Sequence, residues 1–240
     1  MSAQLRSRFV TPGDREAMAR SLAGRRIEAI RRHGKFIVCQ LDRGVLTIHL
    51  GMTGKLLLDG PEGTHSYGVF RLDRGTLVYD DPRQFGSIEY SDALPARVAD
   101  LGPEPLGISL EDFLAMLKAR RTRIKPLLLD QGFVRGIGNI YADEILFRAR
   151  IHPRAVASRL SRRRAMELYA AMRETLALAI EHRGSSISDY VDAAGEKGSF
   201  QLLHRVYGRE AKPCSECGGP IRRILVVQRG THYCPRCQRS

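Results

Sequence analysis

Four cysteines near the C-terminus have the spacing of metal ligands. They form two Cys-x-x-Cys pairs, Cys214 with Cys217 and Cys234 with Cys237, separated by sixteen residues. This spacing is typical of a site in which four thiolates bind one zinc ion. The alternatives are two disulfides or four free thiols, and disulfides are disfavoured in a cytosolic chain. We predict a structural zinc site, because four sulfur ligands leave no open position for water.

The segment between the two cysteine pairs has the pattern of a hairpin. Apolar and basic residues alternate over Ile221–Tyr233 around Gly230, as in a two-stranded hairpin. From Arg205 to Ser240 the chain has eight basic and two acidic residues. Such a hairpin is suited to bind phosphate groups, and the zinc supplies folding free energy that so short a segment lacks.

The whole chain is strongly basic, with a formal net charge of +13. This charge favours a polyanionic partner, although a ribosomal or membrane-surface protein would share it. No apolar run approaches the ~18 residues of a membrane span, and no apolar run follows Arg6 and Arg8 as in a secretory signal. We therefore expect a cytoplasmic, nucleoid-associated monomer that does not bind a membrane.

Two regions of different texture must position these residues. Residues 26–90 contain seven short apolar runs separated by turn residues, which predict an antiparallel sandwich or barrel. The runs are Ile27–Ile30, Phe36–Leu41, Val45–Leu50, Lys55–Leu58, Tyr67–Leu72, Thr76–Tyr79 and Ser87–Tyr90. Residues 1–25 are polar and lack strand signals, and they contain one expected helix at Pro12–Leu22.

A change of composition at Leu101–Leu106 marks an expected domain linker, after which the periodicity becomes helical. The expected helices are Leu110–Ala119, Ile124–Leu129, Ile140–Arg148 and Arg162–His182. Thirteen basic and three acidic residues lie between positions 117 and 165, an excess that favours contact with phosphates. We predict an α+β protein with three domains, at residues 1–100, 101–205 and 206–240.

A glycine-rich turn leads into one of these helices, within Gly132–Glu144. Gly136 and Gly138 permit positive φ and close backbone approach, and the start of the helix offers free N–H groups to an anion. The alternative is a dinucleotide site, but no strand precedes the turn. A helical hairpin that binds one DNA phosphate fits the surroundings better.

Several segments, in order from about Leu22 to the C-terminus, resemble the bacterial formamidopyrimidine-DNA glycosylases. They are His49–Gly54, Asp81–Gly86, Leu101–Leu106, Phe133–Glu144, Val206–Arg209 and the four cysteines. The resemblance implies an antiparallel β-sandwich, a helix–two-turn–helix domain and a C-terminal zinc-finger hairpin, with double-stranded DNA as the partner. It also implies removal of oxidised purines, such as 8-oxoguanine and formamidopyrimidines, and β,δ-elimination at the abasic site.

The resemblance further implies roles for single residues. Met52 and Phe85 match side chains that fill the hole left by an extruded base, although core packing is the alternative for both. Arg83 matches the residue that faces the orphaned partner base. The remaining matches are catalytic Lys35, phosphate-binding and catalytic Arg229, and the DNA contacts His49, His65, Arg120, Lys125, Gly138, Asn139 and Tyr207. Ser185–Phe200 resembles the loop that closes on 8-oxoguanine, or is an ordinary surface loop.

The start of the chain departs from the family pattern. The family's nucleophile is an N-terminal proline followed by a glutamate, whereas this chain opens with Met1-Ser2-Ala3-Gln4. Three interpretations stay open: the reading frame starts upstream, the chain binds damaged DNA without cutting it, or a primary amine such as that of Lys35 has taken over. A non-catalytic damaged-DNA-binding protein is the main alternative function. A ribosomal or transcriptional zinc ribbon would leave the Asp81–Gly86 and Phe133–Glu144 motifs unused.

Overall fold

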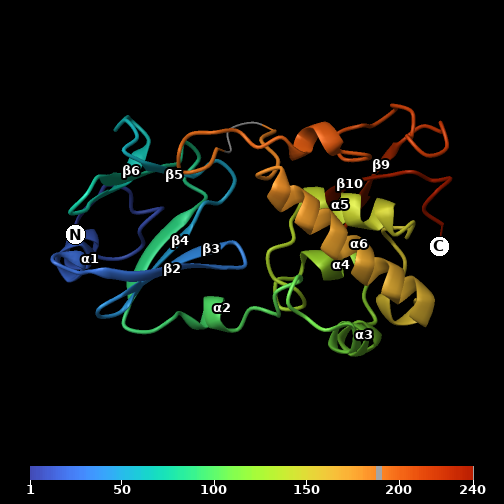
Figure 1. The fold of residues 1–240 in the computed structure, drawn as a ribbon, viewed down its shortest axis with the longest axis horizontal. Coiled ribbons are helices and arrows are strands. Elements are labelled where there is room, and N and C mark those ends of the chain that lie inside the picture. The colour runs from blue at the N-terminus through green and yellow to red at the C-terminus, as the bar shows by residue number, and fades with distance from the viewer. Residues whose placement is uncertain (188–190, 240) are drawn as a thin grey trace. The chain divides into compact units, whose positions relative to one another are not determined.

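A computed structural model describes residues 1–187 and 191–239 (Figure 1). The chain forms two compact units, which we describe separately. Unit 1 comprises the described residues of Met1–Asp100 and Ser185–Ser199, and unit 2 comprises those of Leu101–Gly184 and Phe200–Ser240. The first change of unit therefore falls where the linker begins in the sequence.

Unit 1 contains two four-stranded antiparallel sheets. Strands β2, β3 and β4, which are neighbours in one of these sheets, are labelled in Figure 1. Their strand orders are β1-β6-β7-β5 and β2-β3-β4-β8. The strands are β1 (Ser2–Leu5), β2 (Ile27–His33), β3 (Phe36–Leu41), β4 (Val45–His49), β5 (Lys55–Leu58), β6 (Ser66–Arg71), β7 (Thr76–Asp80) and β8 (Ser87–Ser91). The seven strands predicted over residues 26–90 are all present, because alternating apolar residues place one face of each strand toward a core.

One hydrophobic cluster joins the two sheets of unit 1. Phe70 of β6 and Tyr79 of β7 belong to it, together with Leu46 and Ile48 of β4 and Ile88 of β8. Each of these side chains is at most 2% exposed. Because inner faces of both sheets share this core, unit 1 is an antiparallel β-sandwich, as predicted.

Residues 1–25 differ from the expectation. Ser2–Leu5 forms β1, which pairs with β6, where the sequence predicts no strand. The side chains of β1 alternate between exposed and half-buried positions, so no strong apolar pattern marks the strand. Helix α1 (Arg15–Leu22) begins later than expected, because the Asp14 side chain caps it by accepting a hydrogen bond from the Ala17 N–H at 2.9 Å.

The loop expected over Ser185–Phe200 includes residues 188–190, which lie outside the described residues. Farther along this loop, the Ala193 carbonyl oxygen accepts a hydrogen bond from the Leu58 N–H of β5 at 3.0 Å. The Asp192 carboxylate accepts hydrogen bonds from the Ala194 and Glu196 N–H groups. The described end of the loop is therefore held at β5, an edge strand of its sheet.

Unit 2 consists of helices followed by a short hairpin (Figure 1). After the short helix α2 (Ala96–Ala99) of unit 1 come α3 (Leu110–Lys118), α4 (Ile124–Leu129), α5 (Asn139–Arg148), η1 (Ala157–Arg159), α6 (Arg162–Glu181) and η2 (Phe200–Leu203). Ser109 and Ser161 cap α3 and α6 with their hydroxyls. Apolar residues at helical spacing build one core, which includes Phe113, Ile145 and Leu168. No helix of the described residues is long and apolar enough to cross a membrane.

The C-terminal hairpin turns at a different place than the sequence predicts. Strand β9 (Arg222–Val226) pairs with β10 (Arg229–Tyr233), so the two-residue turn is Val227-Gln228 and Gly230 lies within a strand. Both turn residues have positive φ, +47° and +59°, as a type I′ turn requires. Neither residue type favours that conformation, which is why the sequence pattern misplaces the turn.

Candidate functional site

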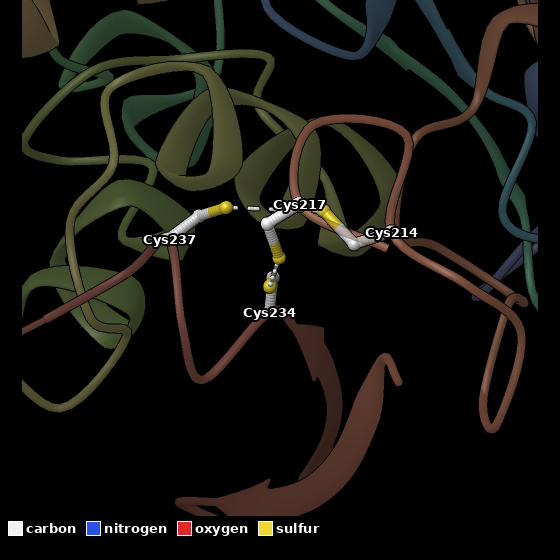
Figure 2. A group of neighbouring side chains, drawn as sticks. All are labelled: Cys214, Cys217, Cys234 and Cys237. Carbon is white, nitrogen blue, oxygen red and sulfur yellow. Dashed lines mark hydrogen bonds between the residues drawn. The ribbon is translucent and has the colours of Figure 1, made fainter. Parts of the chain in front are cut away.

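The four cysteine sulfur atoms point toward one another in unit 2 (Figure 2). All lie within 4.8 Å of one another, with 3.9 Å between Sγ of Cys214 and Cys237 and 3.5 Å between Sγ of Cys217 and Cys234. A tetrahedron with Zn–S bonds of about 2.3 Å has edges of about 3.8 Å, whereas a disulfide bond is about 2.05 Å long. The geometry thus fits one zinc ion bound by four thiolates.

Neighbouring polar groups support both cysteine pairs. A hydrogen bond from the Gly219 N–H is the main reason that the pKa of Cys217 falls to about 7, which favours the thiolate that binds metal. The Gln238 side chain accepts a hydrogen bond from the Cys234 N–H at 2.8 Å and donates one to the Ile151 carbonyl oxygen at 3.0 Å. The second cysteine pair is therefore fixed to the loop that follows α5.

Two exposed apolar side chains project from loops of unit 1. Met52, on the loop between β4 and β5, is 67% exposed, and Phe85, between β7 and β8, is 57% exposed. The Arg83 guanidinium carbon lies 4.5 Å from the centre of the Phe85 ring, within the range of a cation–π interaction. The core-packing alternative for Met52 and Phe85 is thus wrong.

One buried carboxylate fastens both of these loops. Asp81 has no exposed surface, and its Oδ1 accepts a hydrogen bond at 2.6 Å from the hydroxyl of Thr53, in the first loop. Its Oδ2 accepts one at 2.9 Å from the Gly86 N–H, in the second loop, and one at 3.2 Å from the Tyr79 hydroxyl. Gly86 must lack a side chain, because a Cβ there would lie 1.8 Å from the Tyr79 hydroxyl oxygen. The sequence motif includes Asp81 but gives no sign of these partners.

Lys35 lies at the tip of a hairpin of unit 1. Gly34 and Lys35 form the two-residue turn between β2 and β3, in which His33 opposes Phe36. Gly34 has φ +60°, and Lys35 is not among the residues with positive φ. This combination is a type II′ turn, and it leaves the Lys35 side chain exposed.

The two histidines expected to contact DNA lie at different levels of burial. His49, the last residue of β4, accepts a hydrogen bond from the Gly51 N–H through Nδ1 at 3.1 Å. Burial lowers the pKa of His49, and the positive charges of Lys35 and Arg97 lower it further. His65 is exposed, and its Nδ1 lies 3.4 Å from a tyrosine hydroxyl two residues along the chain. His49 is therefore a neutral hydrogen-bonding group near neutral pH.

The glycine-rich turn of unit 2 ends at the N-terminus of α5. Gly136 has φ +92°, which glycine adopts without strain. Gly138 is the N-cap in an extended conformation. The Asn139 amide nitrogen donates to the Gly230 carbonyl oxygen at 3.0 Å, and its buried Oδ1 has no hydrogen-bond partner among the described residues. The start of α5 therefore lies directly beside β10.

Lys125 is completely buried against the hairpin. Its Nζ lies 2.6 Å from Asp143 Oδ1 and donates to the Gly230 carbonyl oxygen at 3.0 Å and the Thr231 hydroxyl at 2.8 Å. Asp143 Oδ2 accepts a hydrogen bond from the His232 N–H at 2.8 Å. Burial lowers the pKa of Lys125, and Asp143 opposes that shift. In this structure Lys125 anchors the hairpin and has no exposed surface for a phosphate, so its predicted contact with DNA stays a prediction.

A second buried acid of α5 holds the segment that precedes the cysteines. The Glu144 carboxylate accepts hydrogen bonds from the N–H groups of Arg205, Val206 and Tyr207 at 2.9, 3.0 and 2.8 Å. Burial raises the pKa of Glu144, and these three donors act in the opposite direction. Asp143 and Glu144 were not predicted to be site residues, although two adjacent acids inside an otherwise apolar helix indicate buried partners.

The remaining expected DNA contacts of unit 2 lie around the hairpin and on one helical loop. The Tyr207 ring packs edge-on against His232, with 5.1 Å between ring centres. Arg229 is exposed and opens β10, directly after the turn. Arg120 is also exposed, on the segment between α3 and α4. The structure thus gathers Asn139, Tyr207 and Arg229 about one hairpin and places Arg120 on a separate segment.

Three models of known domain families match this chain. The formamidopyrimidine-DNA glycosylase N-terminal domain matches residues 2–88, the formamidopyrimidine-DNA glycosylase H2TH domain residues 101–191, and a zinc finger found in FPG and IleRS residues 211–239. These matches coincide with the sandwich, the helices around α5 and the four-cysteine hairpin. The three matches together place the chain among DNA glycosylases with a zinc finger.

Individual relatives give the same result. The formamidopyrimidine-DNA glycosylase of Solibacter usitatus is 60% identical over 233 residues, which are 97% of this chain and 88% of that protein. The chain belongs to the formamidopyrimidine-DNA glycosylase family. The crystal structure of the MutM (FPG) protein from Thermus thermophilus has a TM-score of 0.89 and 41% identity, covering 99% of this chain and 90% of that one. Lactococcus lactis Fpg in complex with DNA containing an abasic site has a TM-score of 0.88 and 34% identity, covering 100% and 92%.

Proposed function

We propose that this chain removes oxidised purines from double-stranded DNA and then cleaves the abasic strand by β,δ-elimination. The observation that carries the proposal is the pair of exposed side chains, Met52 and Phe85, on two loops that one buried carboxylate fastens. An enzyme that acts on a base in a duplex must extrude the base and fill the hole that remains. Rigidly mounted apolar side chains are suited to that task. Solved relatives from Lactococcus lactis were bound to DNA containing Fapy-dG or an abasic site.

The other expected residues fit the same proposal. The Arg83 guanidinium donates hydrogen bonds to the acceptor atoms of the cytosine left without a partner. Arg229 and the N–H groups at the start of α5 bind phosphates of the damaged strand. The exposed ammonium of Lys35 neutralises a phosphate and assists proton transfer. We propose that the chain performs this reaction as a monomer in the nucleoid.

The proposed reaction proceeds through an imine. A protein amine attacks C1′ of the damaged nucleotide, the glycosidic bond breaks, and the purine leaves with a proton. The C1′–O4′ bond then breaks, O4′ takes a proton, and C1′ forms an iminium with the protein amine in the opened sugar. The iminium then draws electrons from the sugar, so that loss of a proton from C2′ expels the 3′ phosphate. A second elimination expels the 5′ phosphate and leaves a one-nucleotide gap.

Borohydride trapping tests this proposal. We expect a covalent adduct between this chain and a duplex carrying 8-oxoguanine opposite cytosine, because borohydride reduces an imine to a stable amine. Peptide mapping then identifies the reacting amine. Lys35→Met should lower the rate of adduct formation by ~10²-fold or more, a typical contribution of a proton-transfer group. Lys55→Met, at the start of β5, is the matched control and should keep the wild-type rate. Tight binding without any adduct would support the alternative of a damaged-DNA-binding protein.

A second prediction concerns the carboxylate that holds the two loops. Asp81→Asn keeps the size of the side chain but removes the negative charge from the group that accepts hydrogen bonds from the Thr53 hydroxyl and the Gly86 N–H. A hydrogen bond to a charged group contributes about 1.5–3 kcal/mol, so we expect kcat/KM for 8-oxoguanine excision to fall ~10- to 100-fold. A 2-aminopurine beside the lesion should show reduced base extrusion. The control is Asp80→Asn, and equal extrusion by both variants would contradict this role of Asp81.

A further inference from the structure

Exposed basic side chains are concentrated where two segments of unit 2 run next to each other. Residues 118–124 lie alongside residues 154–159. Three backbone hydrogen bonds join them, from the N–H groups of Ile124, Ala157 and Ser158 to the carbonyl oxygens of Ala155, Thr122 and Arg120, at 2.8, 3.0 and 3.0 Å. The exposed basic residues of these two segments, together with Arg162 at the start of α6, form what we call the arginine ledge: Lys118, Arg120, Arg121, Arg123, Arg154, Arg159 and Arg162.

Few acidic groups of the protein balance the charge of the ledge, among them Glu111, which lines the same pocket as Lys118 and Arg162. Neither residues 118–129 nor residues 145–166 contain an aspartate or glutamate. No ledge residue forms an ion pair within the described part of the chain. Two of them donate instead to backbone carbonyl oxygens, Lys118 to Ser158 at 3.0 Å and Arg154 to Leu225 at 3.1 Å. Seven like charges on neighbouring segments repel one another, so this surface is stabilised when a polyanion lies on it.

The ledge is continuous with one edge of the zinc hairpin. Leu225 of β9 opposes Gly230 of β10. Arg154 reaches the carbonyl oxygen of Leu225, whereas Lys125 and Asn139 reach that of Gly230. In an antiparallel hairpin, two opposed residues that are not hydrogen-bonded to each other direct their carbonyl groups outward, toward opposite edges of the hairpin. The ledge therefore meets the β9 edge, and the start of α5 meets the β10 edge.

We propose that the arginine ledge is a second phosphate-binding surface, which holds duplex DNA beyond the nucleotides around the lesion. This inference rests on the proposed function, because it takes the hairpin as part of the lesion interface. A duplex carries one negative charge per about 1.7 Å of its axis, so several guanidinium groups on segments next to the hairpin can contact its backbone. The contacts carry no sequence information and hold the protein on undamaged flanking DNA.

The test compares duplexes of two lengths, of about one and about three helical turns, each with a central abasic-site analogue. The ledge variant is Arg121→Ser/Arg159→Ser, and the matched control is Arg43→Ser/Arg74→Ser, two exposed arginines of unit 1. We expect the wild-type chain to bind the long duplex more tightly and with the steeper dependence on salt. The ledge variant should lose about 2 from the slope of log K against log salt on the long duplex, at about 0.9 per phosphate. Its slope on the short duplex should stay unchanged, as should the control's on both.

Two results would overturn the proposal. If the ledge variant keeps the wild-type slope on the long duplex, the ledge does not contact DNA. If it loses affinity equally for both lengths, its residues belong to the lesion interface and form no separate surface. Excision of 8-oxoguanine from the short duplex is measured alongside. Failure of the wild-type chain there counts against the proposed function and leaves the length comparison interpretable on its own.

Discussion

Replacing Cys234 by serine is expected to abolish DNA binding by this chain and to leave the sandwich of unit 1 folded. The buried cluster that supports the hairpin is small, because besides two cysteines it contains only Phe147, Val206 and Ile221 among the described residues. Zinc binding supplies about 10–16 kcal/mol of folding free energy in small zinc domains, and loss of one thiolate removes much of it. Without that free energy, β9 and β10 no longer hold Arg229 in place.

Two measurements check this prediction. Fluorescence polarisation with a labelled abasic-site duplex reports binding, and hydrogen exchange of β6 and β7 amides reports whether the sandwich is folded. A strong chelator should reproduce the loss in the wild-type chain, and added zinc should restore binding. Cys39→Ala is the control, since Cys39 is buried in unit 1 and does not belong to the cluster of four cysteines. Wild-type affinity in the Cys234→Ser chain would show that the hairpin does not need its metal.

Lys125→Met should destabilise unit 2 by about 3–5 kcal/mol, the usual cost of removing one partner of a buried ion pair. The substitution leaves the Asp143 carboxylate buried without its cation. It also removes the hydrogen bonds to the Gly230 carbonyl oxygen and the Thr231 hydroxyl. We therefore expect weaker DNA binding as well, although Lys125 itself has no exposed surface.

A double variant separates the lost ion pair from the lost anchor. Lys125→Met/Asp143→Asn buries no charge, so it should recover part of the stability. Its DNA affinity should stay low, because the Gly230 carbonyl oxygen still lacks its ammonium donor. Hydrogen exchange of α5 amides measures the stability of unit 2. If the single variant were as stable as the wild-type chain, the ion pair between Lys125 and Asp143 would have no role in holding the hairpin.

Sequence patterns were sufficient for most of the fold because each pattern reports a local preference. Seven strands follow from apolar alternation, and four helices from helical spacing with serine caps such as Ser109. The position of the turn at Val227-Gln228 could not be predicted, because neither residue favours the left-handed conformation that the strand register imposes. Strand β1 is half-exposed and gains its place by pairing with β6. Such pairing is decided by distant parts of the chain.

The same distinction applies to the candidate site. The zinc ligands were predictable because their spacing is itself the signal, and the structure brings all four together. Lys125 lies in a basic run and resembles a surface residue. Its ion-pair partner, Asp143, comes eighteen positions later and lies on another helix. The role of Asp81 was equally hard to predict, because its hydrogen-bond partner Thr53 lies on a loop far from it in the chain. Buried polar partners of this kind appear only once the chain is folded.

Side chains from other parts of unit 2 hold both edges of the hairpin, which limits how the zinc finger can be exchanged between proteins. Three side chains donate hydrogen bonds to carbonyl oxygens of the opposed residues Leu225 and Gly230 in the hairpin. These side chains, Lys125, Asn139 and Arg154, lie outside residues 206–240. A fragment limited to residues 206–240 would contain the cysteines but none of these three hydrogen-bond donors. Recombination that exchanged the finger alone would therefore separate co-dependent residues. A transplanted finger should therefore work only in a recipient that supplies equivalent groups.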